Sequence, residues 1–281
     1  MKKISLIVKF IGVFVVGVVI GRFVLAPHPA GATKNRPLYP TLYIAGSSGN
    51  AHSMDAMVNT MTSDKSTHAK KGLTIVVDTE NDNSLKITGK IDGHNDHPTI
   101  EVGMVKGTNN SVKYENALEA IMRYLGKHYN VPYVNVLGFS AGGGGTYRYL
   151  IEHGYDRDLP PIKKWVALDG QFNACTAQPD QTLEQVLKDG PKVKTKYYKF
   201  WQENYERVDK NIQVVLLEGA YDMKKETDGT VPFADAFSIY PLLIKNGNSV
   251  VHYLIKGEDT SHTQMPKNQA AMNYVKTFFY E

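Results

Sequence analysis

The feature that most constrains the fold is an alternation of short apolar segments with helical patterns, which runs from Thr41 to the end of the chain. Strands that alternate with helices in this way indicate βαβ units, in which helices connect parallel strands. We therefore expect an α/β domain over residues 41–281, with a mainly parallel central sheet flanked by helices. Strands are predicted at 41–45, 73–77, 99–105, 133–137, 164–168, 212–217 and 249–255, with a small hairpin near 85–90.

One insertion interrupts this alternation. Residues 172–210 separate two predicted strands and are too many for an ordinary loop, so they are expected to form a small helical cap. Aromatic side chains in the cap either line an apolar pocket or pack the cap onto the domain; they are Tyr197, Tyr198, Phe200, Trp201 and Tyr205. Helices are predicted at 53–63, 114–128, 142–153, 183–187, 195–208, 232–244 and 264–280.

The first 25 residues are almost continuously apolar. Residues 4–25 are numerous enough to span a bilayer if the charged side chains of Lys9 and Arg22 reach the two interfaces. The sequence Ala30-Gly31-Ala32 resembles a signal peptidase site, so a cleaved signal peptide stays open beside an uncleaved anchor. Two lysines precede the apolar segment and predict an inside N-terminus. We expect the domain outside the cell membrane, on a single-pass anchor or secreted.

Residues 26–40 connect this segment to the predicted domain. They contain four prolines and no hydrophobic period. Such a composition is typical of an extended spacer. We therefore expect three parts: an anchor or signal peptide at 1–25, a spacer at 26–40 and the α/β domain at 41–281.

A candidate nucleophile lies where a predicted strand runs into a predicted helix, in the sequence Gly138-Phe-Ser140-Ala-Gly142. A serine on such a sharp turn adopts a strained backbone conformation, and the flanking glycines avoid collisions. The alternative is a structural glycine turn. The glycine run continues through residues 143–145, where each glycine costs about 1 kcal/mol relative to alanine in a helix. Close packing of the helix on the sheet is one explanation for this run.

A serine nucleophile needs a base and an acid. His262 follows the last predicted strand, the position expected of the base in a Ser-His-Asp arrangement. The acid is expected after the strand at 212–217, where both Asp222 and Asp228 qualify. Asp228 is favoured because a following helix would hold it rigidly, and Asp169, after the preceding strand, is a third candidate.

Backbone N–H groups are expected to form the oxyanion hole. One donor should be Ala141, which follows the candidate nucleophile. The second should come from the loop after the first strand, residues 44–50, which is rich in small residues and can approach a reacting carbonyl closely. Ser47 is the chosen donor in this loop, and a simple turn is the alternative interpretation.

Composition excludes several other classes of protein. The net charge is +4 without a block of positive residues, so no nucleic-acid partner is indicated. A single cysteine, Cys175, excludes an internal disulfide and a cysteine-rich metal site. The glycine run lacks the Lys-Ser/Thr of a phosphate-binding loop, and the polar residues 92–97 fit a turn better than a metal site. We expect neither a metal nor an organic cofactor.

The motifs together resemble an α/β-hydrolase family of cell-surface, often membrane-anchored hydrolases of Gram-positive bacteria whose substrates are uncharacterised. The resemblance rests on the Ala45-Gly-Ser-Ser-Gly-Asn50 loop, the Gly138–Gly143 turn, Asp228-Gly-Thr-Val-Pro232 and Thr260-Ser-His262. It implies an α/β-hydrolase fold with a triad of Ser140, Asp228 and His262. The turn departs from the family pattern, because Phe139 and Ala141 stand where histidine and methionine are usual.

These observations predict an extracytoplasmic serine hydrolase that acts on carboxylic esters or acyl lipids through an acyl-enzyme. The expected partners are a small ester or lipid substrate and the membrane, and the oligomeric state stays open. Peptide or thioester hydrolysis and acyl transfer would use the same triad. A rival from another class is a binding protein that keeps the fold without turnover.

Overall fold

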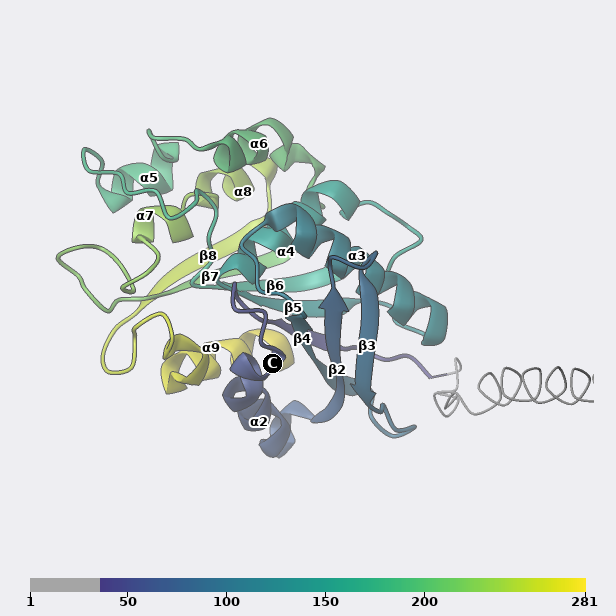
Figure 1. The fold of residues 1–281 in the computed structure, drawn as a ribbon. Helices are drawn as coiled ribbons and strands as arrows, with labels where there is room; N and C mark the ends of the chain where they lie inside the picture. Colours follow the sequence, from purple (N-terminus) through teal and green to yellow (C-terminus); the bar gives the residue numbers. More distant parts are fainter. Residues whose placement is uncertain (1–35) are drawn as a thin grey trace, which may run out of the picture. The chain divides into compact units, whose positions relative to one another are not determined.

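The computed structural model describes residues 36–281, which contain one eight-stranded sheet in the order β3-β2-β4-β1-β5-β6-β7-β8 (Figure 1). Only the β2–β3 pair is antiparallel among the pairs of this sheet. This confirms the predicted α/β fold with a mainly parallel sheet. The strands are β1 (Thr41–Ile44), β2 (Ala69–Asp78), β3 (Ser84–Gly89), β4 (His97–Met104), β5 (Val134–Phe139), β6 (Ile162–Leu168), β7 (Gln213–Gly219) and β8 (Ser249–Ile255).

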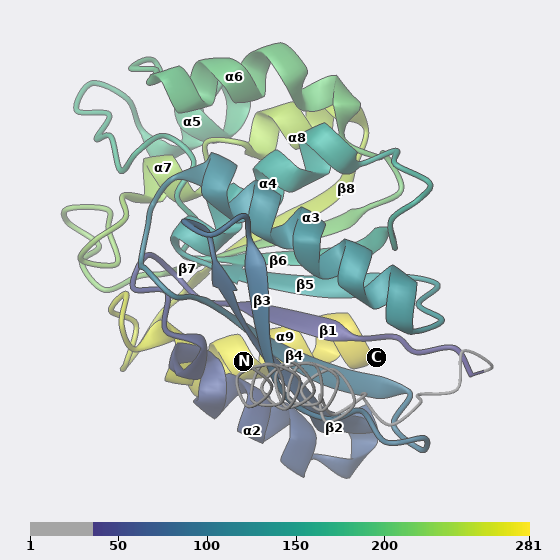
Figure 2. The same ribbon diagram turned by 45° about the vertical axis from the view of Figure 1, so that its right-hand side comes forward.

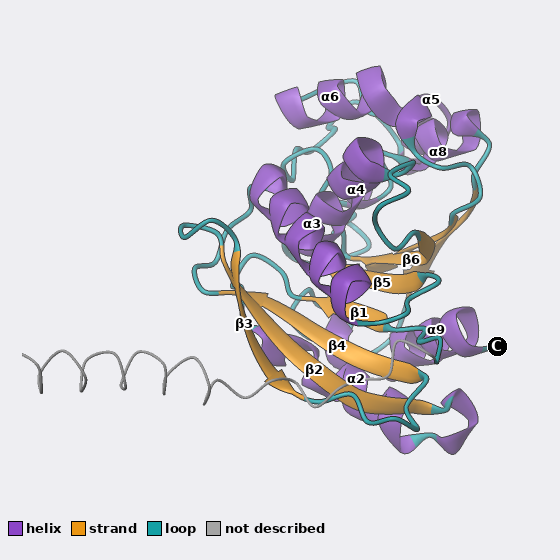
Figure 3. Cartoon of the chain, turned by 90° about the vertical axis from the view of Figure 1, so that its right-hand side faces the viewer, coloured by secondary structure: helices purple, strands orange, loops and turns teal. Residues whose placement is uncertain are grey.

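Helices cover both faces of the sheet (Figure 3). Helices α2 and α9 lie on one face, and α3 and α4 lie on the other with α8 (Figures 1 and 3). This two-sided cover explains why the central strands are apolar throughout rather than alternating. The α-helices are α2 (Asp55–Ser63), α3 (Ser111–His128), α4 (Ala141–His153), α5 (Leu183–Asp189), α6 (Lys196–Asn204), α7 (Phe233–Ala236), α8 (Tyr240–Asn246) and α9 (Gln269–Tyr280).

A methionine-rich core fills the space between the sheet and helices α2 and α9. Tyr43 and Leu137 of the two central strands pack there and are fully buried. Burial of this kind stabilises the domain by about 25 cal/mol for each Å² of apolar surface removed from water. The methionines of this core are Met54, Met57, Met61, Met265 and Met272.

Two predicted helices are interrupted in the structure. The helix predicted at 232–244 is divided into α7 and α8, because Pro241 in the first turn of α8 cannot donate a backbone hydrogen bond. The helix predicted at 264–280 begins as a 3₁₀ turn at Met265–Lys267. The side chain of Asn268 then accepts from the N–H of Ala271 at 3.0 Å and caps the start of α9.

The predicted cap contains two short helices, α5 and α6, which lie beside α8 at one end of the domain (Figure 2). Each begins at a threonine whose side chain accepts a backbone N–H: Thr182 caps α5 and Thr195 caps α6. The connection between β6 and β7 therefore forms ordered helical structure rather than an extended loop.

The start of the described chain packs against the domain. Leu38 is buried, and its N–H donates to the carbonyl of Asn130 at 2.8 Å, so the last residues of the predicted spacer contact the domain. In residues 36–281, every helix is too short or too polar to cross a membrane. The predicted anchor or signal peptide at 1–25 lies outside the described residues.

Candidate active site

Ser140 lies on a sharp turn between β5 and α4, with φ 54° and ψ −123°. A positive φ is uncommon for a residue with a side chain, and such strain concentrates at functional sites. The glycines two positions away permit this turn. A Cβ on Gly138 would lie 2.6 Å from the carbonyl oxygen of Gly142, and a Cβ on Gly142 would lie 2.8 Å from that of Ala45.

The rest of the glycine run is explained by close contacts on different sides of α4. A Cβ on Gly144 would lie 2.3 Å from the carbonyl oxygen of Gln171, and one on Gly145 would lie 2.1 Å from the Cβ of Tyr114. A Cβ on Gly143 would lie 3.1 Å from the Cα of Gly170. The first turn of α4 is therefore enclosed by backbone and by α3, which offsets the helix propensity that the glycines lose.

His262 connects Ser140 to Asp228. Its Nε2 lies 3.0 Å from Ser140 Oγ, and its Nδ1 lies 2.5 Å from Asp228 Oδ2. The ring of Phe139 packs against the imidazole with their centroids 4.9 Å apart. The three predicted residues thus come together from three separate loops, in the geometry that lets an imidazole accept a proton from a serine hydroxyl.

The buried side chain of Asp228 is held by its own loop. Its Oδ1 accepts backbone N–H groups of Thr230 and Val231 at 2.7 and 2.6 Å, which leaves Oδ2 for the histidine. The alternative acid, Asp222, caps a different turn, where it accepts the N–H of Lys224 and that of Lys225. The structure therefore joins Asp228, not Asp222, to the imidazole.

A second buried carboxyl group, that of Asp169, lies behind the histidine. Its Oδ2 is 3.7 Å from His262 Nδ1 and has no hydrogen-bond partner, while its Oδ1 accepts the N–H of Gly219 at 3.0 Å. Burial, and then the charge of Asp228, raise the pKa of Asp169 well above its usual value. The third candidate acid therefore also lies at the site, but it forms no hydrogen bond with the imidazole.

Glu218 is a neighbour of Asp169 that was not among the residues predicted from the sequence. It is fully buried at the end of β7, and both carboxylate oxygens lack a partner. Burial, and then the charges of Asp169 and Asp228, raise the pKa of Glu218 well above its usual value, which favours a neutral acid. A charged residue in the otherwise apolar run of β7 was the available signal for this group.

The loop after β1 contacts the turn of Ser140. A Cβ on Gly46 would lie 3.0 Å from Ser140 Cβ, so this loop passes directly beside the candidate nucleophile. The buried hydroxyl group of Tyr114 donates to the carbonyl of Gly46 at 2.7 Å and lies 3.1 Å from that of Ala45. Tyr114 was also missed, because its role depends on a contact between residues 68 positions apart.

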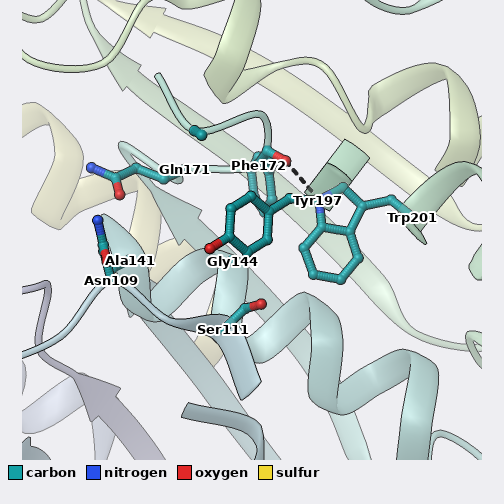
Figure 4. Close-up of a pocket in the computed structure, with 9 residues that line it drawn as sticks. Asn109, Ser111, Ala141, Gly144, Gln171, Phe172, Tyr197 and Trp201 are labelled. Carbon is teal, nitrogen blue, oxygen red and sulfur yellow. Dashed lines mark hydrogen bonds between the residues drawn. The ribbon is translucent and has the colours of Figure 1, made fainter. Parts of the chain in front are cut away.

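A pocket is lined by Ala141, the residue after Ser140, and by residues of the cap (Figure 4). Two cap aromatics, Tyr197 and Trp201, line it, and the Trp201 indole N–H donates to the carbonyl of Phe172 at 2.6 Å. Tyr198 and Tyr205 are buried where the cap packs on α8, and they also line a separate pocket there. The cap aromatics therefore divide between the two predicted roles.

Three clusters of histidine and acidic side chains in the described chain have the spacing of metal ligands. In each, a histidine ring nitrogen already lies within hydrogen-bond distance of a carboxylate oxygen. Hydrogen bonds therefore suffice to hold these side chains close together, without a bound cation. The clusters are His52, Asp55 and Glu101; Glu115, Glu119 and His153; and Asp169, Asp228 and His262.

Solved structures resemble the chain over most of its length. The product of the lin2722 gene from Listeria innocua has a TM-score of 0.80 at 21% identity, covering 87% of this chain and 94% of its own. A "putative cell surface hydrolase" from Lactobacillus plantarum WCFS1 has a TM-score of 0.65 at 18% identity, covering 86% of this chain and 91% of its own. No curated protein matches the chain.

The family described as "Alpha/beta hydrolase of unknown function (DUF915)" matches residues 28–281. This match covers the whole described domain, including the turn of Ser140 and the loops of Asp228 and His262. The sheet order, the flanking helices and this match together confirm the predicted α/β-hydrolase fold. The chain belongs to the DUF915 family of α/β hydrolases.

Proposed function

We propose that this protein is an extracytoplasmic serine hydrolase that cleaves carboxylic esters. The observation that carries the proposal is the continuous contact from Ser140 Oγ through the His262 imidazole to Asp228 Oδ2. The strained turn of Ser140 and the family of the chain support it. Acyl lipids are included as substrates because the apolar segment at 1–25 would keep the domain beside a membrane.

Each residue has a defined role in the proposed reaction. Ser140 Oγ attacks the ester carbonyl while His262 Nε2 accepts its proton, and Asp228 orients the imidazole and stabilises its charged form. The N–H groups of Ala141 and Ser47 stabilise the tetrahedral oxyanion. His262 then protonates the leaving alcohol, and water hydrolyses the acyl-enzyme by the same steps.

A fluorophosphonate probe, which reacts with activated serines, tests this proposal on the purified full-length protein. We expect wild type to be labelled and Ser140→Ala to be unlabelled, with one label per chain by mass spectrometry. Ser53→Ala is the matched control, because the Ser53 hydroxyl is also buried but has no hydrogen-bond partner and lies in the 3₁₀ turn at Ala51–Met54. A folded wild-type protein that is neither labelled nor active on any ester would support the rival, a binding protein.

The proposed location has a separate test. Protease added to intact cells should degrade the domain, and mass spectrometry of the mature N-terminus should find either Met1 or a residue just after Ala32. Protection of the domain in intact cells, with degradation after lysis, would contradict an extracytoplasmic location while leaving the chemistry of Ser140 unaffected.

A further inference from the structure

The pocket beside Ala141 lies between the N-termini of two helices. Helix α3 begins at Ser111 and helix α4 at Ala141, and both residues line the pocket (Figure 4). The cavity measures about 50 Å³, a size that suits a small ligand group. Free N–H groups at helix N-termini give such a space a positive potential, which favours oxygen atoms of a ligand.

An unpaired hydroxyl group adds to this polarity. Ser111 is 5% exposed, and its Oγ is buried without any hydrogen-bond partner. Leaving a buried polar group unpaired is unfavourable, so a hydroxyl group in the wall of a pocket would gain from pairing with a ligand. The side-chain amides of Asn109 and Gln171 also line this pocket. None of the described residues that line it is charged.

The far wall of the pocket is aromatic and closely packed. Phe172 and Trp201 are each 1% exposed and are joined by the indole N–H to carbonyl hydrogen bond. Tyr197 lies beside them (Figure 4). Because this wall is fixed by packing, a long acyl chain would have to displace it, whereas a short group fits in front of it.

The position of His262 decides which part of an ester enters this pocket. In the proposed reaction His262 protonates the leaving oxygen, so the leaving group lies on the histidine side of Ser140. The described pocket lining includes Ala141 and Gly144 of α4 but not His262. The acyl group, attached to the other side of the same carbonyl carbon, therefore faces the pocket.

We propose that this pocket is the acyl subsite and that it selects short acyl groups carrying a hydroxyl or similar hydrogen-bonding group, with Ser111 as their main partner. The proposal rests on the proposed function, since it assumes attack by Ser140. It narrows the substrate from carboxylic esters in general to esters of short, polar acids.

Two 4-nitrophenyl esters of equal size test the selection. The 3-hydroxybutyrate and the 3-methylbutyrate differ by a hydroxyl group in place of a methyl group, and their rates are normalised to alkaline hydrolysis. We expect wild type to prefer the hydroxy ester in kcat/KM by about 3- to 10-fold, the equivalent of one added hydrogen bond. The octanoate ester should be hydrolysed more slowly than either.

Substitutions identify the residue that pairs with the hydroxyl group of the acyl chain. Ser111→Ala should remove most of the preference, whereas Ser238→Ala should keep it, because the Ser238 hydroxyl is equally buried and unpartnered but does not line this pocket. Asn109→Ala, at an exposed position, should lower the preference in part and remains informative if Ser111→Ala fails to fold.

Equal rates for the two short esters, or fastest hydrolysis of the octanoate, would overturn the acyl-subsite proposal. In that case fluorophosphonate labelling of Ser140 would still support the proposed serine hydrolase function. Absence of both labelling and hydrolysis would overturn the proposed function, and the acyl-subsite proposal with it.

Discussion

In the proposed reaction, Tyr114 is expected to position the Ser47 N–H of the oxyanion hole without contacting the substrate. Its hydroxyl donates to the carbonyl of Gly46 at 2.7 Å. That carbonyl and the N–H of Ser47 belong to one peptide group, and in a trans peptide they point in opposite directions. Fixing the carbonyl toward Tyr114 therefore fixes the Ser47 N–H on the opposite side. Tyr114→Phe removes this constraint and changes nothing else in the covalent structure of the site.

The expected decrease in kcat follows from the loss of the Tyr114 hydrogen bond. Complete loss of an oxyanion donor lowers kcat by about 10²–10³, but here the donor stays and only its orientation is released. One neutral hydrogen bond contributes about 0.5–1.5 kcal/mol, which corresponds to a roughly 2- to 13-fold decrease in kcat if it is felt in the transition state. KM should change little, because the ground-state ester does not depend on this N–H.

Steady-state hydrolysis of 4-nitrophenyl acetate measures the change, together with the free energy of unfolding in urea. Tyr147→Phe is the matched control, because Tyr147 is fully buried in α4 and its hydroxyl has no partner. We expect this control to retain wild-type kcat. A Tyr114→Phe variant that loses stability but keeps wild-type kcat and KM would show that the hydrogen bond supports only the fold, and would refute the positioning argument.

Two further predictions concern the acidic groups. Asp228→Asn should lower kcat on the order of 10²–10⁴. Adding Asp169→Asn should lower kcat further, because the Asp169 carboxyl group is the nearest remaining acidic group to the imidazole. Asp222→Asn is the control and should keep wild-type kcat. Glu218→Gln should flatten the dependence of stability on pH. A carboxyl group whose pKa is raised in the folded state stabilises the fold at low pH. This contribution is lost as the pH rises through the folded pKa. The loss is roughly 1.4 kcal/mol for each pH unit between the unfolded and folded pKa values. Urea unfolding between pH 5 and 9 measures this, and an unchanged slope in the variant would contradict it.

Much of the fold was predictable because it depends on local pattern. A strand buried on both faces is apolar almost throughout, so β5 and β7 could be located from the sequence alone. The division of the predicted helix into α7 and α8 was harder to predict from the sequence. Its apolar residues continue through the break, and only Pro241 indicated it, yet proline is also common in the first turn of an intact helix.

The parts of the site that follow strand order were also predictable. Ser140, Asp228 and His262 each follow a strand of the parallel sheet, whose carboxyl ends lie at one edge, so their proximity followed from topology. Contacts between layers were not predictable in this way. Tyr114 lies on α3 and reaches the loop after β1, and nothing in the local sequence of either element indicates that approach.

The carboxyl groups behind His262 show how burial gives neighbouring acids different roles. Asp228 has two backbone N–H donors on Oδ1 and the imidazole on Oδ2, so both of its oxygens are paired. Glu218 has no donor on either oxygen, so it is most stable as a neutral acid that can donate a proton. The Oδ2 of Asp169 is also unpartnered and lies 3.7 Å from His262 Nδ1. A proton held by Glu218 would therefore reduce the repulsion that three buried charges behind the imidazole would create.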